Sequence, residues 1–339
     1  MSVDRSPGQI VPSGWRAVVG VIAAALLVVG IALLLVRAAG FGEVRDATEK
    51  AESTWFVVCL GAQLVALSAY AAVFRRAFRW DGAPDPGFRV SAYVMLAGIG
   101  ATRVFAAGGV GAIAVTYWCF RRARLPAEDA IVRVLGFNAL FYVAFGVGVW
   151  TAALVTVTGS WGDVPQALAL PWLVVVPAIA LAAVVATEPA RVERLTQPGG
   201  AFARRALAYA VAAVAWARSA LRDPAGRRML GATVLYWVGN IACLWASLRS
   251  VGETPSFPEL ALAFAARHAA MILPLPLGGV GGVDAAMTYA LTAVGVPLAH
   301  ALVAVGVYRL FSFWLPTVPA LAALPLLPGV GRRLAALPT

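Results

Sequence analysis

Arg309 is a charged residue within a long apolar stretch, where placing a charge in hydrocarbon costs free energy. It lies ten residues after Ala299, inside the apolar stretch 299–326. A helix rises ~1.5 Å per residue, which places Arg309 about 15 Å deep, near the middle of a hydrocarbon core ~30 Å thick. A central arginine costs at least ~2.5 kcal/mol on insertion scales, so its side chain is expected to face a wet cavity or a partner. We interpret Arg309 as part of a binding site; the alternative is a structural pair with Asp284 or with carbonyl groups at a helix end.

Further basic residues lie in two other apolar segments. Arg267 and His268 stand near mid-depth of residues 259–296. A guanidinium group can grip a phosphate with two parallel hydrogen bonds, which suits a lipid headgroup. His268 has a side chain that titrates near neutral pH, although a hydrogen-bonded packing role is the simpler interpretation. Arg103, within residues 91–120, is expected to mark the cytoplasmic end of a substrate path.

Three polar residues complete the candidate substrate-binding set. Asp284 is the one acidic residue between Glu259 and the carboxyl terminus. It would balance a positive substrate group or pair with an arginine, and the sequence leaves both roles open. Asn138 occupies the position that corresponds to Arg309 in an earlier, similar part of the chain. Tyr308 is included as the neighbour of Arg309, although packing or an interfacial position is the simplest role for an aromatic residue in a span.

The chain offers little to support catalysis. Its three cysteines form no CxxC pair, and it has only two histidines. No metal-ligand spacing and no nucleophile–base arrangement is present. The glycine clusters lack the GK[ST] of a phosphate-binding loop. We therefore expect no metal, no cofactor and no enzymatic activity.

The elements that position these residues are predicted to be membrane helices. Hydrophobic residues make up 61% of the 339 positions and charged residues 13%, whereas soluble domains carry about 25% charged residues. A span needs ~20 apolar residues. The predicted spans are residues 17–36, 55–74, 130–158, 168–187, 229–249 and 299–326. The sequence therefore predicts an all-α polytopic protein, a single integral membrane domain over residues 1–339.

The net charge of +11 indicates topology and not nucleic-acid binding. Arginine-rich loops alternate along the chain with loops that are poor in arginine, and basic loops stay in the cytoplasm. Both termini are accordingly expected on the cytoplasmic side of a bacterial inner membrane. Within the basic loop 188–228, the apolar stretch 206–217 is flanked by arginines. It predicts an amphipathic helix on the cytoplasmic surface, or equally a simple connector helix.

Two copies of one glycine pattern interrupt apolar segments. Residues 108–111 and 278–281 both read GGVG. The residues expected to break helices and act as hinges are Gly108, Gly109, Gly111, Pro274, Pro276, Gly278, Gly279, Gly281 and Gly282. The half-segments are too short to span, and such backbone survives at membrane depth only inside protein or beside a wet cavity. We predict two re-entrant hairpins in addition to six full spans.

The loop charges place the two hairpins on opposite faces of the membrane. Three spans separate them, so the first repeat, residues 91–158, and the second, residues 259–326, have opposite orientation. Paired broken segments of this kind are typical of a transport site between inverted repeats.

The second repeat resembles a known family. PLPLGGVGGVDAAMTYALTAVGV, from Pro274, and VYRLFSFWLP, from Val307, are similar to the flippase-like membrane domain of bacterial lysylphosphatidylglycerol synthases. The matching positions are Pro276, Gly278, Gly279, Gly281, Asp284, Gly295, Val296, Tyr308, Arg309, Phe313, Trp314 and Pro316. The family's acid is usually glutamate, and the first repeat departs further, with GGVGAIAV where relatives often carry Gly-Glu and then arginine. The layout of most of the chain agrees, but the motif is specific over residues 274–316.

The resemblance implies lipid translocation. We expect a stand-alone membrane domain, without the soluble aminoacyl-transferase domain, that binds and flips a phospholipid or lipid-linked anionic substrate. Arg267 and Arg309 would hold the phosphate. Two alternatives stay open: a lipid-modifying enzyme that uses Asp284 and His268, and a non-transporting partner of an envelope glycosyltransferase. Homo-oligomers and envelope-biosynthesis partners are both compatible with the sequence.

Overall fold

The computed structural model describes residues 30, 33–34, 36–78, 85–104, 110–159, 164–188, 202–271 and 281–335. Throughout these residues the regular elements are helices, and no strand occurs among them. In chain order they are α2 (Phe41–Glu49), α3 (Thr54–Ala77), α4 (Gly87–Val104), α5 (Val110–Arg122), α6 (Ala127–Val157), α7 (Gln166–Ala186), α9 (Phe202–Arg222), α10 (Pro224–Ser250), α11 (Phe257–Ala270), α12 (Gly282–Ala293), α13 (Leu298–Arg309), α14 (Leu315–Ala323) and α15 (Leu327–Ala335). The chain is thus an all-α protein, as the composition predicts.

Five helical stretches among the described residues are long and apolar enough to cross a membrane. They are Thr54–Ala77, Ala127–Val157, Gln166–Ala186, Pro224–Ser250 and Leu298–Ala335. Each coincides with a stretch that the sequence predicts to span. The sixth predicted span, residues 17–36, lies almost entirely outside the described residues. A multi-pass membrane protein follows, while the total of six spans stays a prediction.

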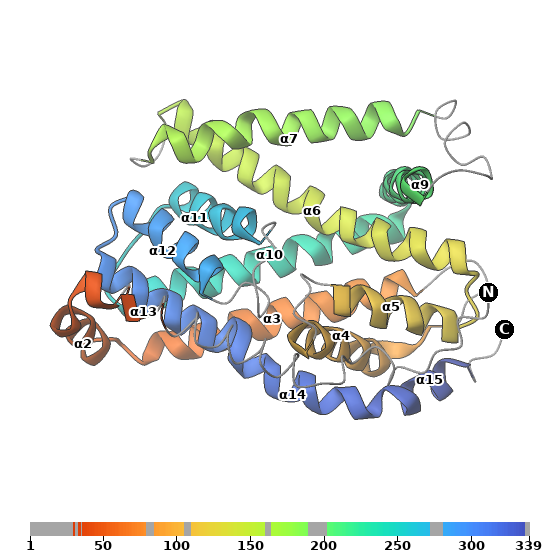
Figure 1. Ribbon diagram of the computed structural model, residues 1–339, viewed down its shortest axis with the longest axis horizontal. Coiled ribbons are helices and arrows are strands. Elements are labelled where there is room, and N and C mark those ends of the chain that lie inside the picture. Colours follow the sequence, from red (N-terminus) through yellow and green to blue (C-terminus); the bar gives the residue numbers. More distant parts are fainter. Residues whose placement is uncertain are drawn as a thin grey trace.

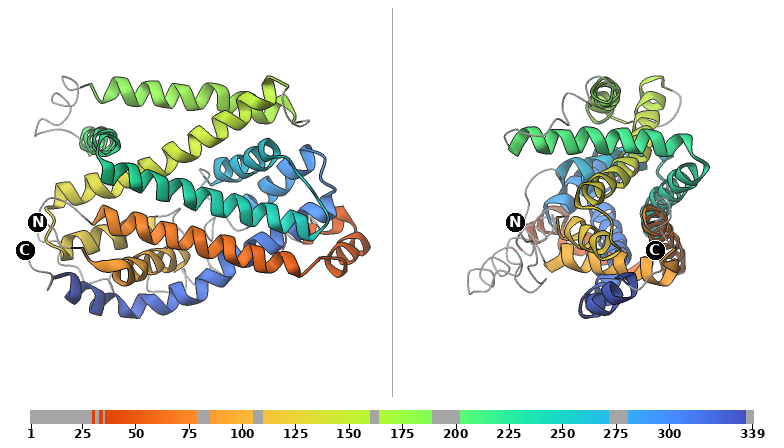
Figure 2. Two further views of the ribbon diagram at one scale, coloured as in Figure 1. Left: turned by 180° about the vertical axis from the view of Figure 1, so that it is seen from behind. Right: turned by 90° about the vertical axis from the view of Figure 1, so that its right-hand side faces the viewer.

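Helices α3 and α10 run side by side through the bundle (Figure 2). Their backbones approach closely because Gly239 has no side chain: an added Cβ would lie 2.7 Å from the carbonyl oxygen of Ala62 and 2.9 Å from the Cβ of Ala66. Small residues at such crossings are typical of membrane helices, since close packing replaces the hydrophobic driving force. The two helices therefore pack closely where they cross at Gly239.

Each interrupted apolar segment forms two helices, α4 with α5 and α11 with α12. Helices α5, α11 and α12 have 13, 14 and 12 residues, well below the ~20 that a span requires. The two pairs lie toward opposite ends of the molecule (Figure 1). That placement is the one an inverted repeat requires, and the symmetry relation itself stays a prediction. The turns, residues 105–109 and 272–280, lie outside the described residues.

The last span contains a π-helical turn, Leu310–Trp314, between α13 and α14. It begins directly after Arg309 and precedes Pro316, which has no amide hydrogen to donate. A π turn inserts an extra residue into the helical repeat and is frequent at functional sites. The chain continues through α14 and α15 along one edge of the bundle (Figure 1).

Helix α9 lies across α6, roughly perpendicular to the bundle axis (Figure 2). It contains the apolar stretch 206–217 but extends over 21 residues. The ring of Trp216 fills the space beside Gly136 of α6, where a Cβ would collide with it. Arg205, Arg218 and Arg222 of this helix are exposed. The amphipathic surface helix and the simple connector helix both stay predictions for this segment.

Candidate functional site

Arg309 ends α13 and is buried, with 6% of its surface exposed. Its Nε donates to the carboxylate of Asp284, so the structural pair that the sequence left open is formed. The pair uses only part of the guanidinium group. One terminal nitrogen, Nη2, is buried without a hydrogen-bond partner. Arg309 is therefore anchored on one side and unsatisfied on the other.

Asp284 lies in the first turn of α12, where the helix dipole favours a negative charge. Its second carboxylate oxygen accepts a hydrogen bond from the Gly281 amide, with N···O 3.2 Å. Gly281 has φ +90°, a left-handed backbone conformation that only glycine adopts without strain. These two bonds hold the carboxylate toward α13. The side chain stays 20% exposed.

Arg103 and Arg309 share the ring of Phe313. The Cζ of Arg103 lies 3.5 Å from the ring centroid, and that of Arg309 lies 4.9 Å from it. An aromatic face attracts a cation, so one ring stabilises two guanidinium groups that repel each other. Phe313 belongs to the π turn. The irregular turn thereby joins α4 to α13.

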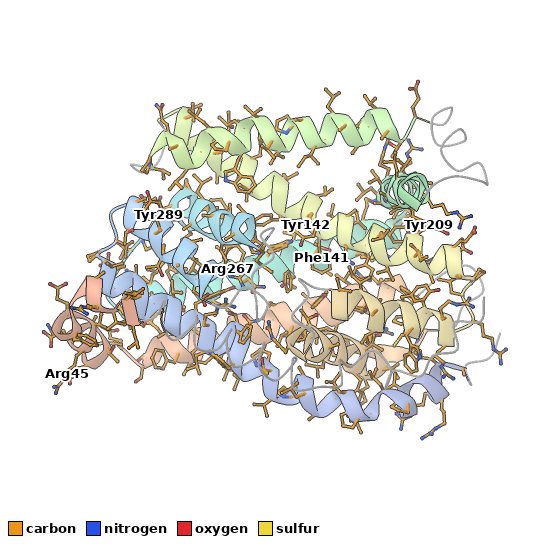
Figure 3. All side chains as sticks on the ribbon, in the orientation of Figure 1. Arg45, Phe141, Tyr142, Tyr209, Arg267 and Tyr289 are labelled. Carbon is orange, nitrogen blue, oxygen red and sulfur yellow. The ribbon has the colours of Figure 1, made fainter. Side chains whose placement is uncertain are left out.

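Arg267 reaches the same region from α11. Its Cζ lies 5.5 Å from the ring centroid of Phe264 and 5.7 Å from that of Tyr308. Figure 3 shows Arg267 in the interior of the bundle. Its charge acts on both Arg103 and Arg309, so the three cations form one electrostatic group. We call Arg103, Arg267 and Arg309 the arginine cluster.

The arginine cluster has more positive charge than its surroundings balance. Among the described residues its one ion pair is with Asp284, which leaves two of three guanidinium charges uncompensated. The Nε atoms of Arg103 and Arg267 are also buried without a hydrogen-bond partner. A buried unsatisfied donor costs about 1–3 kcal/mol, and more when charged. An arrangement of this kind is suited to receive an anion.

His268 and Tyr308 are packed beside the cluster. The Nδ1 of His268 lies 2.9 Å from the Phe264 carbonyl oxygen, and its ring centroid is 4.6 Å from that of Phe145. This geometry agrees with the packing role that the sequence favoured. Tyr308 is 1% exposed and donates to Oδ1 of Asn240 at 3.3 Å. Its ring forms part of the wall against Arg267.

The other predicted site residues are Asn138 and the helix-breaking residues, and only some of these lie in the described part of the chain. Asn138 donates to the Val134 carbonyl oxygen at 2.7 Å, within its own helix, whereas Arg309 pairs with Asp284. Gly111 faces the backbone of Ala101, where a Cβ would come within 2.6 Å, so this glycine permits the contact between α4 and α5. Gly282 begins α12. The predicted hinge residues outside the described part of the chain are Gly108, Gly109, Pro274, Pro276, Gly278 and Gly279.

Sequence reasoning missed the role of Phe313. The sequence indicates Phe313 only as a position of the family motif, yet its ring lies against two of the three arginines. Its position four residues after Arg309 places it on the same helical face, which is a usable signal. The π turn that adjusts its angle leaves no clear mark in the sequence.

The family comparison covers nearly the whole chain. Residues 21–320 match the family model described as the lysylphosphatidylglycerol synthase TM region. The chain belongs to this family. A search of curated proteins gave no match. Membership in the lysylphosphatidylglycerol synthase TM family identifies the protein as a membrane protein linked to lipid handling.

Proposed function

We propose that the protein binds an anionic lipid, a phospholipid or a lipid-linked substrate, by its phosphate at the arginine cluster and moves it between leaflets. The observation that carries the proposal is a set of three neighbouring guanidinium groups, each with a buried nitrogen atom, with one carboxylate paired to Arg309. Each keeps a nitrogen without a hydrogen-bond partner. Membership in a lipid-handling family supports the lipid as the source of the anion.

The chemistry of the cluster suits a phosphate diester. Arginine stays charged and presents its donors as a planar fork, so it holds phosphate oxygens with defined geometry. A phosphate crossing hydrocarbon would lose its hydration, and nearby cations offset that cost in a region of low dielectric. The Asp284 carboxylate keeps Nε of Arg309 occupied, which directs the remaining donors elsewhere. Asp284 thus orients the site and limits its net charge.

A transport assay tests the proposal. The protein is reconstituted in phosphatidylcholine vesicles that contain a fluorescent phosphatidylglycerol, and dithionite reports how fast outer-leaflet and inner-leaflet lipid exchange. Wild-type protein should accelerate exchange, and Arg267→Gln should reduce that acceleration at least tenfold because it removes a phosphate donor. Arg267 is the cleanest test since it has no ion pair among the described residues.

Arg249 offers a matched control. It also has a buried Nε without a partner and lies over an aromatic ring, with Cζ 5.2 Å from the Trp55 centroid, but it is outside the cluster. Arg249→Gln should transport as the wild type does. Equal loss in both variants, or wild-type transport by Arg267→Gln, would contradict the proposal. Formation of a new lipid product would support the enzyme alternative. Absence of both lipid exchange and a new product would support the partner-subunit alternative.

A further inference from the structure

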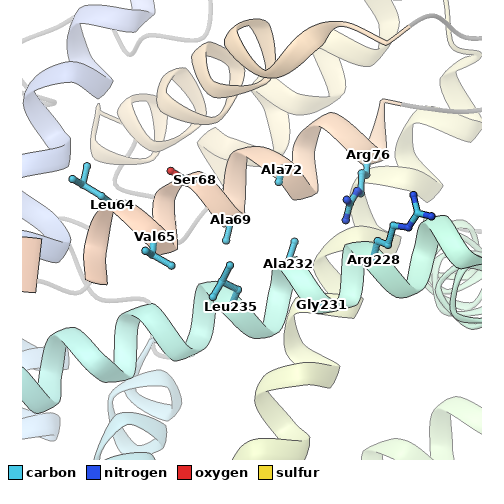
Figure 4. Close-up of a pocket in the computed structure, with 10 residues that line it drawn as sticks. All are labelled: Leu64, Val65, Ser68, Ala69, Ala72, Arg76, Arg228, Gly231, Ala232 and Leu235. Carbon is cyan, nitrogen blue, oxygen red and sulfur yellow. The ribbon is translucent and has the colours of Figure 1, made fainter. Parts of the chain in front are cut away.

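A second lipid-accessible feature lies between α3 and α10, on the surface and apart from the arginine cluster. Beyond the close contact at Gly239, the two helices border a groove of about 660 Å³ (Figure 4). That volume falls within the ~300–1,000 Å³ of small-molecule sites. The helices contribute small residues to its floor, including Ala69, Ala72, Gly231 and Ala232. An added Cβ at Gly231 would meet nothing within 4 Å, so the space is open.

The groove has the length of one membrane leaflet. It extends along α3 from Leu64 to Arg76. The twelve helical steps between these two residues rise about 18 Å, compared with about 15 Å for half of the hydrocarbon core. Leu64 and Leu235 are exposed apolar side chains along it. A single acyl chain that lies parallel to the helices would contact apolar surface over its whole length.

Two cations mark one end of the groove. Arg76 from α3 and Arg228 from α10 face each other across it (Figure 4). Both lie near the ends of their helices on the arginine-rich side of the molecule, where the arginine distribution predicts the headgroups of one leaflet. Each guanidinium group can donate hydrogen bonds to the oxygens of a phosphate placed between the two helices.

We propose that this groove binds one anionic phospholipid of the leaflet on the arginine-rich side. An acyl chain lies along Ala69, Ala72 and Ala232, and the phosphate lies between Arg76 and Arg228. A second copy of the chain fits less well. A two-fold axis along the membrane normal would bring four arginines together at the same depth, because both copies share one orientation. The site is distinct from the arginine cluster and does not depend on transport.

The experiment measures lipid retention and labelling. Protein is reconstituted in nanodiscs of phosphatidylcholine and phosphatidylglycerol at nine to one, with a trace of phosphatidylglycerol that carries a diazirine on its acyl chain. After illumination, peptide mapping locates the adducts, and native mass spectrometry counts retained phosphatidylglycerol. Wild-type adducts should fall on α3 and α10 beside the groove. Arg228→Gln should lower labelling there several-fold, and Gly231→Leu should lower it by filling the space.

Two matched controls make the result specific. Arg227→Gln removes the same charge from the neighbouring position, outside the groove. Gly61→Leu adds the same side chain at another helical glycine with nothing within 4 Å, also outside it. Both should label as the wild type does. Folding is checked by gel filtration and thermal stability, and Arg267→Gln should keep the labelling even if it loses transport.

Three results would overturn the inference. Equal labelling of the wild type and Arg228→Gln would show that Arg228 does not bind the phosphate. Adducts spread evenly over the lipid-facing helices would show that no site exists. Efficient disulfide formation between copies that carry Leu235→Cys, with loss of lipid labelling, would assign the groove to a second copy.

Discussion

At the scale of single residues, the Arg309–Asp284 pair decides how the site is charged. Asp284 receives one bond from Arg309 and one from the Gly281 amide, so it is part of the framework as well as part of the site. The pair therefore joins α12 to α13 and also neutralises one positive charge of the arginine cluster.

Asp284→Asn should destabilise the protein more than Asp284→Glu. Removing the charge leaves Arg309 buried without a counter-ion, and breaking a buried pair costs roughly 3–5 kcal/mol, with the low end expected because Asp284 is 20% exposed. Thermal unfolding in detergent, followed by circular dichroism, measures the difference. The Asp284→Glu variant keeps the charge, and its loss of stability should be less than half that of Asp284→Asn. Equal melting temperatures for the two variants would show that the pair contributes nothing to the fold.

Phe313 provides a second test at this scale. Its ring faces Arg103 at 3.5 Å and Arg309 at 4.9 Å. Phe313→Leu keeps an apolar side chain but removes the aromatic face, which is worth about 0.5–2 kcal/mol per cation. Lipid exchange should fall while folding is retained, and Phe313→Tyr should restore it. Full activity of the leucine variant would limit Phe313 to packing.

At the scale of elements, the bundle depends on close backbone contacts. Gly239 permits α3 and α10 to meet, and Gly111 permits α4 and α5 to meet. Each glycine lies within a helix and has ordinary helical backbone angles. It permits the close contact because it has no side chain. The groove between α3 and α10 lies beyond the Gly239 contact.

Gly239→Val should separate α3 from α10. A Cβ at this position would lie 2.7 Å from a backbone oxygen of Ala62, which cannot rotate away. Overpacking of this kind typically costs 1–3 kcal/mol or more. The yield of monodisperse protein on gel filtration should drop, whereas Gly231→Ala, in open space on the same helix, should behave as the wild type does. Normal yield and stability of the valine variant would disprove the contact.

At the scale of the whole molecule, the distribution of arginine predicts which face is cytoplasmic. The two helical hairpins lie toward opposite ends (Figure 1), so a lipid headgroup between them would be approached from both sides. The arginine cluster draws one residue from each pair and one from the last span: Arg103 from α4, Arg267 from α11 and Arg309 from α13. No single element contains the site.

Cysteine labelling tests this orientation. The native cysteines, Cys59, Cys119 and Cys243, are all buried and should give a low background. Glu253→Cys, in the loop between α10 and α11, should react with a membrane-impermeant maleimide added to intact cells. Ala335→Cys should react only after the membrane is opened. The reverse pattern would invert the predicted topology.

The sequence by itself determined the class of the molecule and most of its spans. Apolar stretches of spanning length are visible without any tertiary information, because each helix satisfies its own backbone hydrogen bonds in lipid. The family motif also identified Asp284 and Arg309 as important. An arginine within a span stands out because its burial is costly.

Only the tertiary structure decided which polar residues meet. Asp284 was equally compatible with either arginine or with substrate, and the packing of α12 against α13 selects Arg309. Arg103, Arg267 and Phe313 lie far apart in the chain, so their meeting depends on helix packing and on the π turn. The groove between α3 and α10 depends on how the two helices pack beyond their contact at Gly239. The pattern of apolar residues in a helix indicates which of its faces is buried. The distance between two helices depends on the side chains of both, so it cannot be inferred from either sequence pattern alone.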